Sequence, residues 1–243
     1  MKKRTTYFIS DLHLQRDQPN TTAIFLRFLR EQAIQAEALY ILGDFFEMWV
    51  GDDDGSPFNL QIMAALKQAT DGGLSVYFMR GNRDFLIGRR FAEKTGVRLL
   101  DDPTVIDLYG QRILLMHGDS LCILDQRHQN TRRFYLNPRN QKWALMLLPL
   151  FFRRQLGRWA RRKSRNIQTD LPLYITDVVQ EEVEREMRKH RVLRLIHGHT
   201  HRPGFHDFKL DGQRAQRVVL GAWHQFGSAL LCNDSAPPEL LTL

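Results

Sequence analysis

The chain is short of cysteine and has no long apolar run. Its two cysteines, Cys122 and Cys232, fit neither a disulfide framework nor a CxxC or zinc-ribbon spacing. No stretch of 18 apolar residues occurs, which excludes a helix that spans a membrane. An aspartate interrupts the apolar run of the basic start MKKRTTYFISD, so this segment is expected to be a first strand and not a signal peptide. We therefore expect a reduced, cytoplasmic protein.

Linkers and repeats are also missing. The 243 residues contain no internal repeat, low-complexity tract or flexible linker, and 43% of them are hydrophobic. This is enough apolar material for one substantial core. We therefore expect a single domain over residues 1–243.

Acidic residues are absent from one long segment. Between Gln126 and Thr169 lie twelve Lys and Arg residues and no Asp or Glu, whereas the rest of the chain has 23 basic against 27 acidic residues. The formal net charge of +8 therefore comes from this segment alone. Such a basic block predicts a polyanionic partner: nucleic acid, a phosphorylated substrate or an anionic membrane surface.

Strand-like and helix-like patterns alternate along most of the chain. Strands are predicted at 5–10, 38–42, 75–79, 112–116 and 192–196, helices at about 20–35, 58–70 and 174–189, and β-rich segments at 205–210, 216–222 and 228–232. The first helix is expected to be capped by Asn20-Thr21. The βαβ alternation predicts an α/β fold with a largely parallel sheet covered on both faces.

Residues 125–170 interrupt this alternation and are predicted to form a helical insertion. Leu148, Phe152, Leu156 and Trp159 make one apolar stripe at helical spacing, and arginines occupy the other side. The segment is therefore predicted to be a basic amphipathic insertion that lies over the sheet edge where the candidate ligands gather.

Five short polar motifs each follow a short apolar run. They are Asp11-Leu12-His13, Gly43-Asp44, Gly81-Asn82-Arg83-Asp84, His117-Gly118-Asp119 and Gly198-His199-Thr200-His201. Apolar runs of this length are typical of buried parallel strands, and ligands outside the carboxyl ends of such strands converge on one edge of a sheet. Five distant segments are therefore expected to meet at one place.

The side chains of these motifs suit a pair of metal ions. The i, i+2 spacing of Asp11 and His13 at a strand end is expected to direct both to one face, and His199 with His201 repeats it. A carboxylate such as that of Asp44 can bridge two cations. Oxygen and nitrogen ligands without thiolate fit Mn²⁺, Fe²⁺ or Zn²⁺ and argue against a structural zinc site. Two such ions about 3.5–4 Å apart activate water and hold a phosphoryl group.

The five motifs resemble those of the calcineurin-like metallophosphoesterases, whose pattern is D-x-H, GD, GN-H-D/E, H and GH-x-H. The resemblance implies a layered αββα sandwich with the insertion as a lid. It also implies seven ligands to two ions. One ion takes Asp11, His13, Asp44 and His201, and the other takes the bridging Asp44 with Asn82, His117 and His199.

Arg83 departs from the common pattern, which has histidine after Gly-Asn as a candidate proton donor. Arginine cannot donate this proton, because its pKa lies above about 12. A leaving group that needs no proton is therefore expected, such as a phosphate monoester released from a pyrophosphate, which Arg83 can grip in bidentate fashion. The alternative is that Arg83 merely pairs with Asp84.

Longer segments resemble the UDP-2,3-diacylglucosamine pyrophosphohydrolases of lipid A biosynthesis in Gram-negative bacteria. They are GDFFEMWVGDD, GNRDFLIGRRF, HGDSLCILD, HGHTHRP and RVVLGAWH, within about residues 5 to 227. The resemblance implies water attack at the α-phosphorus of UDP-2,3-diacylglucosamine with Mn²⁺ as the usual metal, giving UMP and 2,3-diacylglucosamine 1-phosphate. The catalytic residues so implied are Arg83 and His117, and the substrate-binding residues are Asn82, Arg83, Asp125, Ser164, Gln168 and His199. The family commonly has Asn at position 168 and Lys at position 171, where this chain has Gln168 and Leu171.

For this substrate the insertion would supply a hydrophobic surface for acyl chains and cations for phosphates. Its aromatics are Phe134, Trp143, Phe151, Phe152 and Trp159. They are expected either to contact lipid and an anionic inner-membrane surface on its cytoplasmic face, or to pack the insertion onto the core. Trp49 is expected to line the acyl entrance or to cap the core.

The histidines outside the motifs carry weaker expectations. His128, His190 and His206 are expected to be ordinary surface or loop residues, whereas His197 and His224 are candidates to orient metal ligands.

Two rival functions remain open at this point. A metallophosphoesterase acting on nucleic acid or a soluble nucleotide would use the insertion as a phosphate track, with binding that falls steeply with salt. A non-catalytic scaffold would be expected to lose ligands, and none is missing here. Under the leading hypothesis the protein is expected to be a monomeric enzyme that binds no nucleic acid.

Overall fold

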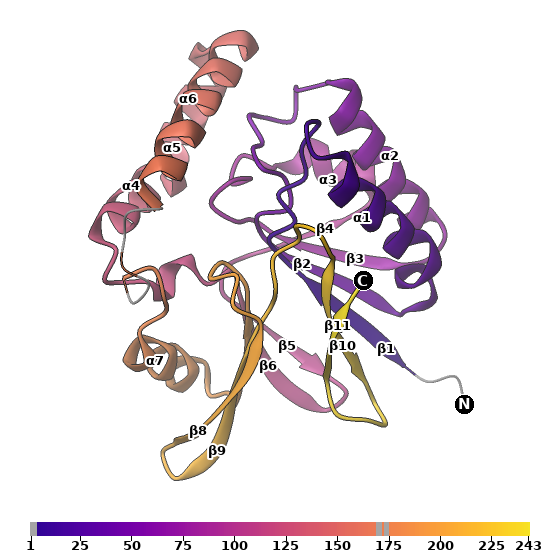
Figure 1. Cartoon of the computed structure of the whole chain (residues 1–243), viewed down its shortest axis with the longest axis vertical. Helices are drawn as coiled ribbons and strands as arrows, with labels where there is room; N and C mark the ends of the chain where they lie inside the picture. Colours follow the sequence, from indigo (N-terminus) through magenta and orange to yellow (C-terminus); the bar gives the residue numbers. More distant parts are fainter. Residues whose placement is uncertain (1–3, 169–171, 173–174) are drawn as a thin grey trace.

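The computed structural model describes residues 4–168, 172 and 175–243, with the side chains of 162–168 left aside. Its strands form two sheets (Figure 1). The first sheet has the order β11 (Glu239–Thr242), β10 (Ser228–Asn233), β1 (Thr5–Ile9), β2 (Ala38–Leu42), β3 (Ser75–Met79) and β4 (Arg98–Leu100). The second has the order β5 (Thr104–Leu108), β6 (Gln111–Met116), β7 (Arg194–His197), β9 (Gln213–Val219) and β8 (Gly204–Leu210).

The two sheets pack face to face. Their shared core joins Phe8 and Leu42 of the first sheet to Leu115, Ile196 and Val218 of the second. The layered αββα sandwich is therefore confirmed, and each sheet is covered by helices on one face and by the other sheet on the second face. The apolar patterns of the strands do not show whether a covered face meets a helix or another sheet.

Helices cover the outer faces of both sheets. The first sheet is covered by α1 (Pro19–Glu31), α2 (Pro57–Asp71) and α3 (Arg89–Thr95), and the second by α7 (Gln180–His190). Phe25 and Phe28 of α1 and Leu66 of α2 are buried in the first of these interfaces. Parallel strands β1 to β4 and β6, β7 and β9 direct their carboxyl ends to the edge where the motifs lie.

Two helix starts differ from the prediction. α1 begins at Pro19 with Gln18 at the N-cap, because proline suits the first helical position, so the expected Asn20-Thr21 cap is wrong. α7 begins at Gln180, six residues later than expected. The N–H of Val179 donates to Leu121 O (3.0 Å), a tertiary bond that keeps Val179 extended. The predicted strands are confirmed to within three residues at either end, whereas β4, β5 and β11 were not predicted; β4 and β11 have only three and four residues.

The insertion is helical, as predicted. It consists of α4 (Gln126–Leu136), α5 (Pro138–Leu147) and α6 (Leu150–Gln168), which lie together on one side of the molecule (Figure 1). No helix among the described residues is both long and apolar enough to cross a membrane.

The arginines of α6, not its aromatics, attach it to the core. Arg153 is buried, and its guanidinium donates to Val50 O (2.5 Å) and to both oxygens of Asp53. Arg154 pairs with Asp54 on the same loop. The five aromatics considered for lipid contact stay exposed instead, by 58 to 68%: Phe134, Trp143, Phe151, Phe152 and Trp159. The hypothesis that they pack onto the core is therefore wrong. Trp49, by contrast, is buried among core aromatics.

Candidate metal centre

All five motifs meet at one edge, and they come from both sheets. Asp11 follows β1, Asp44 follows β2 and Asn82 follows β3 in the first sheet. His117 follows β6 and His199 follows β7 in the second. The predicted convergence is confirmed, but the edge belongs to the sandwich and not to a single sheet.

One group of ligand-type atoms consists of Asp11, His13 and His201. His13 Nε2 and His201 Nε2 face one another at 3.3 Å, and His201 Nε2 lies 3.3 Å from Asp11 Oδ1. Asp11 and His13 are buried, whereas the side chain of His201 is 35% exposed. The arrangement is thus open on the His201 side.

The second group consists of Asp44, Asn82, His117 and His199. Asn82 Oδ1 lies 3.0 Å from His117 Nε2 and 3.1 Å from His199 Nδ1. Asp44 Oδ1 lies 3.6 Å from His117 Nε2, and its Oδ2 lies 4.0 Å from His13 Nε2. Asp44 therefore faces both groups, as a bridging carboxylate must.

Five of these residues have left-handed backbone conformations, with φ between 50° and 68°: Asp11, His13, Asp44, His199 and His201. Positive φ is uncommon for residues other than glycine, and such strain clusters at functional sites. The expected reason for the pairing of Asp11 with His13 is therefore wrong. The two side chains converge because both residues leave the extended conformation after β1, and not because they alternate along a strand.

Two glycines allow the motifs to approach one another. Gly43 has φ +86°, and a Cβ placed on it would lie 2.5 Å from His117 Nδ1. A Cβ on Gly198 would lie 2.4 Å from Asp11 Oδ2. The N–H of His199 instead donates to that oxygen at 2.9 Å. Any side chain at these two positions would push apart the two groups of ligand-type residues.

Opposite charges and burial set the protonation of the centre. Burial alone would lower the pKa of His117, but nearby carboxylates, first that of Asp44, raise it to about 9. Burial and the charge of His117 hold the pKa of His199 well below its usual range. Burial would raise the pKa of Asp11, but hydrogen bonding and charge from His201 hold it low. The centre thus has an ionised carboxylate and a neutral imidazole ready at neutral pH.

These residues fit divalent cations. The described residues contain two sets of three ligand-type atoms, and within each set the atoms lie within 4.8 Å of one another. One set comes from Asp11, His13 and His201, and the other from Asp44, His117 and His199. Asp11 Oδ1 is buried, and it lies 3.3 Å from His201 Nε2, which is itself a ligand-type atom. A buried, ionised carboxylate is costly unless opposite charge such as that of a cation compensates it. Carboxylate, amide and imidazole donors without thiolate match Mn²⁺, Fe²⁺ or Zn²⁺.

Arg83 is oriented by its backbone N–H, and the Nε of its guanidinium has no hydrogen-bond partner among the described residues. Its N–H donates to Asp44 Oδ1 (2.9 Å), whereas Nε is buried. Asp84 accepts instead from the N–H groups of Gly81 (2.7 Å) and Phe45 (2.8 Å). The alternative that Arg83 merely pairs with Asp84 is therefore wrong. Asp84 joins the second and third motifs through their backbones.

Three further residues expected to bind substrate lie on the insertion. Asp125 caps α4, since its Oδ1 accepts from the N–H of His128 (2.8 Å). Ser164 and Gln168 lie on α6 where only the backbone is described, and Leu171 lies outside the described residues. Their expected contacts with substrate stay predictions.

Glu47 is a functional neighbour that the motifs did not reveal. Its Oε2 lies 3.0 Å from His13 Nδ1, and its Oε1 pairs with Arg161 of α6 (2.5 Å). Burial would raise the pKa of Glu47, but the hydrogen bond and charge of His13 lower it to about 2. Glu47 therefore orients a candidate ligand and joins it to the insertion. Its position three residues after Asp44 was the only signal.

Asp119 connects the fourth motif to α4. Its Oδ2 accepts from Arg132 Nε (2.8 Å) and Tyr135 OH (3.1 Å). The same oxygen lies 3.7 Å from His128 Nε2, and the ring of His128 lies 5.3 Å from that of His199. The expectation that His128 is an ordinary surface residue is therefore wrong. Helical spacing within α4 brings these side chains to one face.

His197 and His224 have different surroundings. His197 is buried, with Nδ1 2.9 Å from Gly198 O and Nε2 3.3 Å from Arg217 Nη1, so it holds the turn that carries the last motif. His224 is exposed, and its ring lies 6.2 Å from that of His201. Only His197 has contacts that suit an orienting role.

The two-sheet fold and the paired ligand groups define a metal-dependent phosphoesterase. A model of the calcineurin-like phosphoesterase family matches residues 4–203. Proteins named UDP-2,3-diacylglucosamine hydrolase are similar to almost the whole chain. The relative from Coxiella burnetii (strain Dugway 5J108-111) is 54% identical over 227 residues, which cover 93% of both chains. Those from Pseudomonas aeruginosa (strain UCBPP-PA14) and Salmonella arizonae are 53% and 50% identical over 223 residues, covering 92% of both chains.

The chain therefore belongs to the calcineurin-like phosphoesterases and, among them, to the family of UDP-2,3-diacylglucosamine hydrolases. Membership of the calcineurin-like phosphoesterase family implies a dinuclear metal centre, and the two groups of ligand-type residues are the candidates for it.

Proposed function

We propose that this protein hydrolyses UDP-2,3-diacylglucosamine in lipid A biosynthesis, by water attack at the α-phosphorus. The products are UMP and 2,3-diacylglucosamine 1-phosphate. The observation that carries the proposal is the pair of ligand groups bridged by Asp44 in a chain 54% identical to a hydrolase of that name. Residues 1–243 act as one domain, with residues 125–170 as a lid over the centre.

Two Mn²⁺ ions are the proposed cofactors, with Fe²⁺ and Zn²⁺ as alternatives that the same donors accept. Asp11, His13 and His201 would hold one ion, and Asn82, His117 and His199 the other, with Asp44 shared between them. When bound, such a pair activates water and neutralises the phosphoryl oxygens.

Arg83 is the proposed substrate clamp and, with His117, one of the two proposed catalytic residues. Its guanidinium carries a buried, unpaired Nε beside the two ligand groups, and a guanidinium matches two phosphate oxygens at once. Because arginine keeps its proton, it stabilises a departing phosphate and does not protonate an alkoxide. A pyrophosphate substrate has this leaving group. Asn82 and His199 face the same space, which supports their proposed contacts with the phosphates.

The lid is the proposed site of the acyl chains and of membrane contact. Its exposed aromatics give an apolar surface, and its basic residues complement the phosphates of the substrate. Asp125, Ser164 and Gln168 are proposed to contact the glucosamine or its phosphate. We further propose that the protein is a monomer bound peripherally at the cytoplasmic face of the inner membrane, where aromatics and arginines suit an anionic lipid surface.

The rival function, hydrolysis of nucleic acid or a soluble nucleotide, is not favoured. Exposed Phe134, Trp143 and Phe152 alternate with arginines on the insertion, which suits a lipid better than a plain phosphate track. The names of the relatives point the same way.

The test is hydrolysis by metal-depleted protein that has been reloaded with Mn²⁺. UMP should form from UDP-2,3-diacylglucosamine with wild type, and the variants Asp44→Asn and His117→Ala should lose activity together with bound metal. Arg214→Gln, which changes an exposed residue of β9, serves as the matched control and should keep both. Cleavage of a plain phosphodiester without release of UMP from the lipid substrate would favour the rival.

A further inference from the structure

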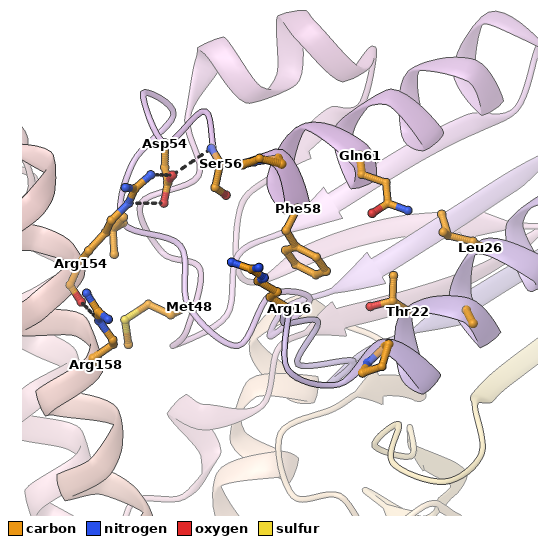
Figure 2. Close-up of a pocket in the computed structure, with 14 residues that line it drawn as sticks. Arg16, Thr22, Leu26, Met48, Asp54, Ser56, Phe58, Gln61, Arg154 and Arg158 are labelled. Carbon is orange, nitrogen blue, oxygen red and sulfur yellow. Dashed lines mark hydrogen bonds and ion pairs between the residues drawn. The ribbon is translucent and has the colours of Figure 1, made fainter.

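A pocket of about 830 Å³ lies between α1, the loop that leads into α2, and α6 (Figure 2). Ligand pockets commonly have volumes of 300–1,000 Å³. Its apolar lining comes from Pro19, Ala23, Leu26, Met48, Val50 and Phe58. None of the seven candidate metal ligands lines it. The pocket is therefore distinct from the metal centre, although α6 borders both.

Three arginines give this pocket its charge. Arg154 is already paired with Asp54, as Figure 2 shows, whereas Arg16 and Arg158 have no acidic partner among the described residues. Arg158 Nε reaches only the backbone oxygen of Arg154, at 3.4 Å. Two uncompensated guanidinium groups thus lie beside an apolar surface, which complements a ligand that is anionic at one end and apolar at the other.

The geometry of α6 separates this pocket from the proposed acyl-chain surface. Leu156 lies two residues from Arg154 and two from Arg158, which is about 200° around an α-helix from either. Leu156 is 53% exposed and belongs to the aromatic side of α6. The arginines of the pocket therefore lie on the opposite side of α6 from Leu156.

We propose that this pocket binds one anionic phospholipid molecule. Arg16 and Arg158 would hold its phosphate, because a guanidinium forms charge-assisted and often bidentate bonds with phosphate oxygens. An acyl chain would cover Leu26, Phe58 and Met48 and so remove their apolar surface from water. The site goes beyond the proposed hydrolysis and does not depend on it.

Short-chain lipids below their critical micelle concentration test this proposal without a bilayer. Dihexanoyl phosphatidylglycerol should bind with one-to-one stoichiometry in calorimetry. Dihexanoyl phosphatidylcholine, which lacks the net charge, and glycerophosphoglycerol, which lacks the chains, should each bind at least about tenfold more weakly. Equal binding of either one would overturn the proposal, since then the charge or the chains would not be recognised.

Matched variants localise the binding to the pocket. Arg158→Gln removes a charge and Ala23→Trp fills the apolar part, and each should weaken binding at least about tenfold. Arg27→Gln and Ala64→Trp make the same changes at exposed positions of α1 and α2 outside the pocket, and they should stay within about twofold of wild type. Loss of binding in the control variants, or its retention in both pocket variants, would contradict the site.

The metal-centre variant Asp44→Asn separates this inference from the proposed function. It should bind the phospholipid as wild type does, even though it cannot hydrolyse UDP-2,3-diacylglucosamine. Loss of phospholipid binding in this variant would place the lipid at the metal centre and would refute a separate site.

Discussion

Replacing Arg153 by alanine should detach the insertion from the core. The Arg153 side chain is 6% exposed and joins α6 to the loop after the second motif through Val50 O and the carboxylate of Asp53. It also holds Leu148 O at 2.9 Å, immediately before its own helix. No other arginine of α6 whose side chain is described is as buried.

The expected cost follows from these contacts. Truncation leaves Val50 O without its donor, which costs about 1–3 kcal/mol. The pair with Asp53 adds about 0–1 kcal/mol, since the Asp53 side chain is 44% exposed and solvent screens it. A total of about 3 kcal/mol lowers the equilibrium constant for docking of the insertion roughly 150-fold. Arg154→Ala removes a guanidinium on a side chain that is 41% exposed and leaves Asp54 with the N–H of Ser56 as a donor, so it should cost no more than about 1 kcal/mol.

Hydrogen exchange over residues 126–161 and steady-state kinetics provide the assay. In Arg153→Ala the amides of α6 should exchange faster and KM for the lipid substrate should rise, while a small water-soluble phosphodiester is cleaved as before. Arg154→Ala should differ little from wild type. Unchanged exchange in Arg153→Ala, or an equal effect of both variants, would refute the reasoning that a buried arginine holds the insertion.

Three further predictions concern the centre itself. Gly43→Ala should lower the free energy of unfolding by at least about 2 kcal/mol, and the melting temperature by several degrees in calorimetry, because φ is +86° and the new Cβ meets His117. The Mn²⁺ affinity of the metal-free protein should rise with pH, because binding displaces the proton of His117, whose pKa is raised to about 9. Between pH 6 and pH 8 the affinity should increase roughly tenfold per pH unit. An affinity that does not change with pH would contradict a protonated His117. Arg83→Lys should keep its metal in elemental analysis but lose roughly 10- to 100-fold in kcat/KM, since an ammonium cannot replace a bidentate contact.

The candidate ligands could be found from the sequence because a simple rule applies to them. A buried strand ends where its apolar run ends, so the sequence alone predicts strand ends just before Asp11, Asp44, Asn82, His117 and His199. The rule does not specify which sheet each strand joins. That depends on pairing between distant segments, such as β1 with β10, which local pattern does not encode.

The contacts between the insertion and the core could not be predicted from the sequence for a related reason. An amphipathic helix shows two faces, and apolar faces usually turn inward. Here Arg153 is buried and Phe152 is 59% exposed, because the core offers Asp53 and carbonyl groups at the point of contact. The role of Glu47 could not be predicted either, because it depends on contacts with His13 and Arg161, which come from different parts of the chain.

The central claim is water attack at the α-phosphorus of UDP-2,3-diacylglucosamine. Hydrolysis in water enriched in oxygen-18, with Mn²⁺ present, tests it most directly when both products are weighed by mass spectrometry. The account predicts one heavy oxygen in UMP and none in 2,3-diacylglucosamine 1-phosphate. The heavy oxygen in the sugar phosphate, or an absence of UMP altogether, would contradict it.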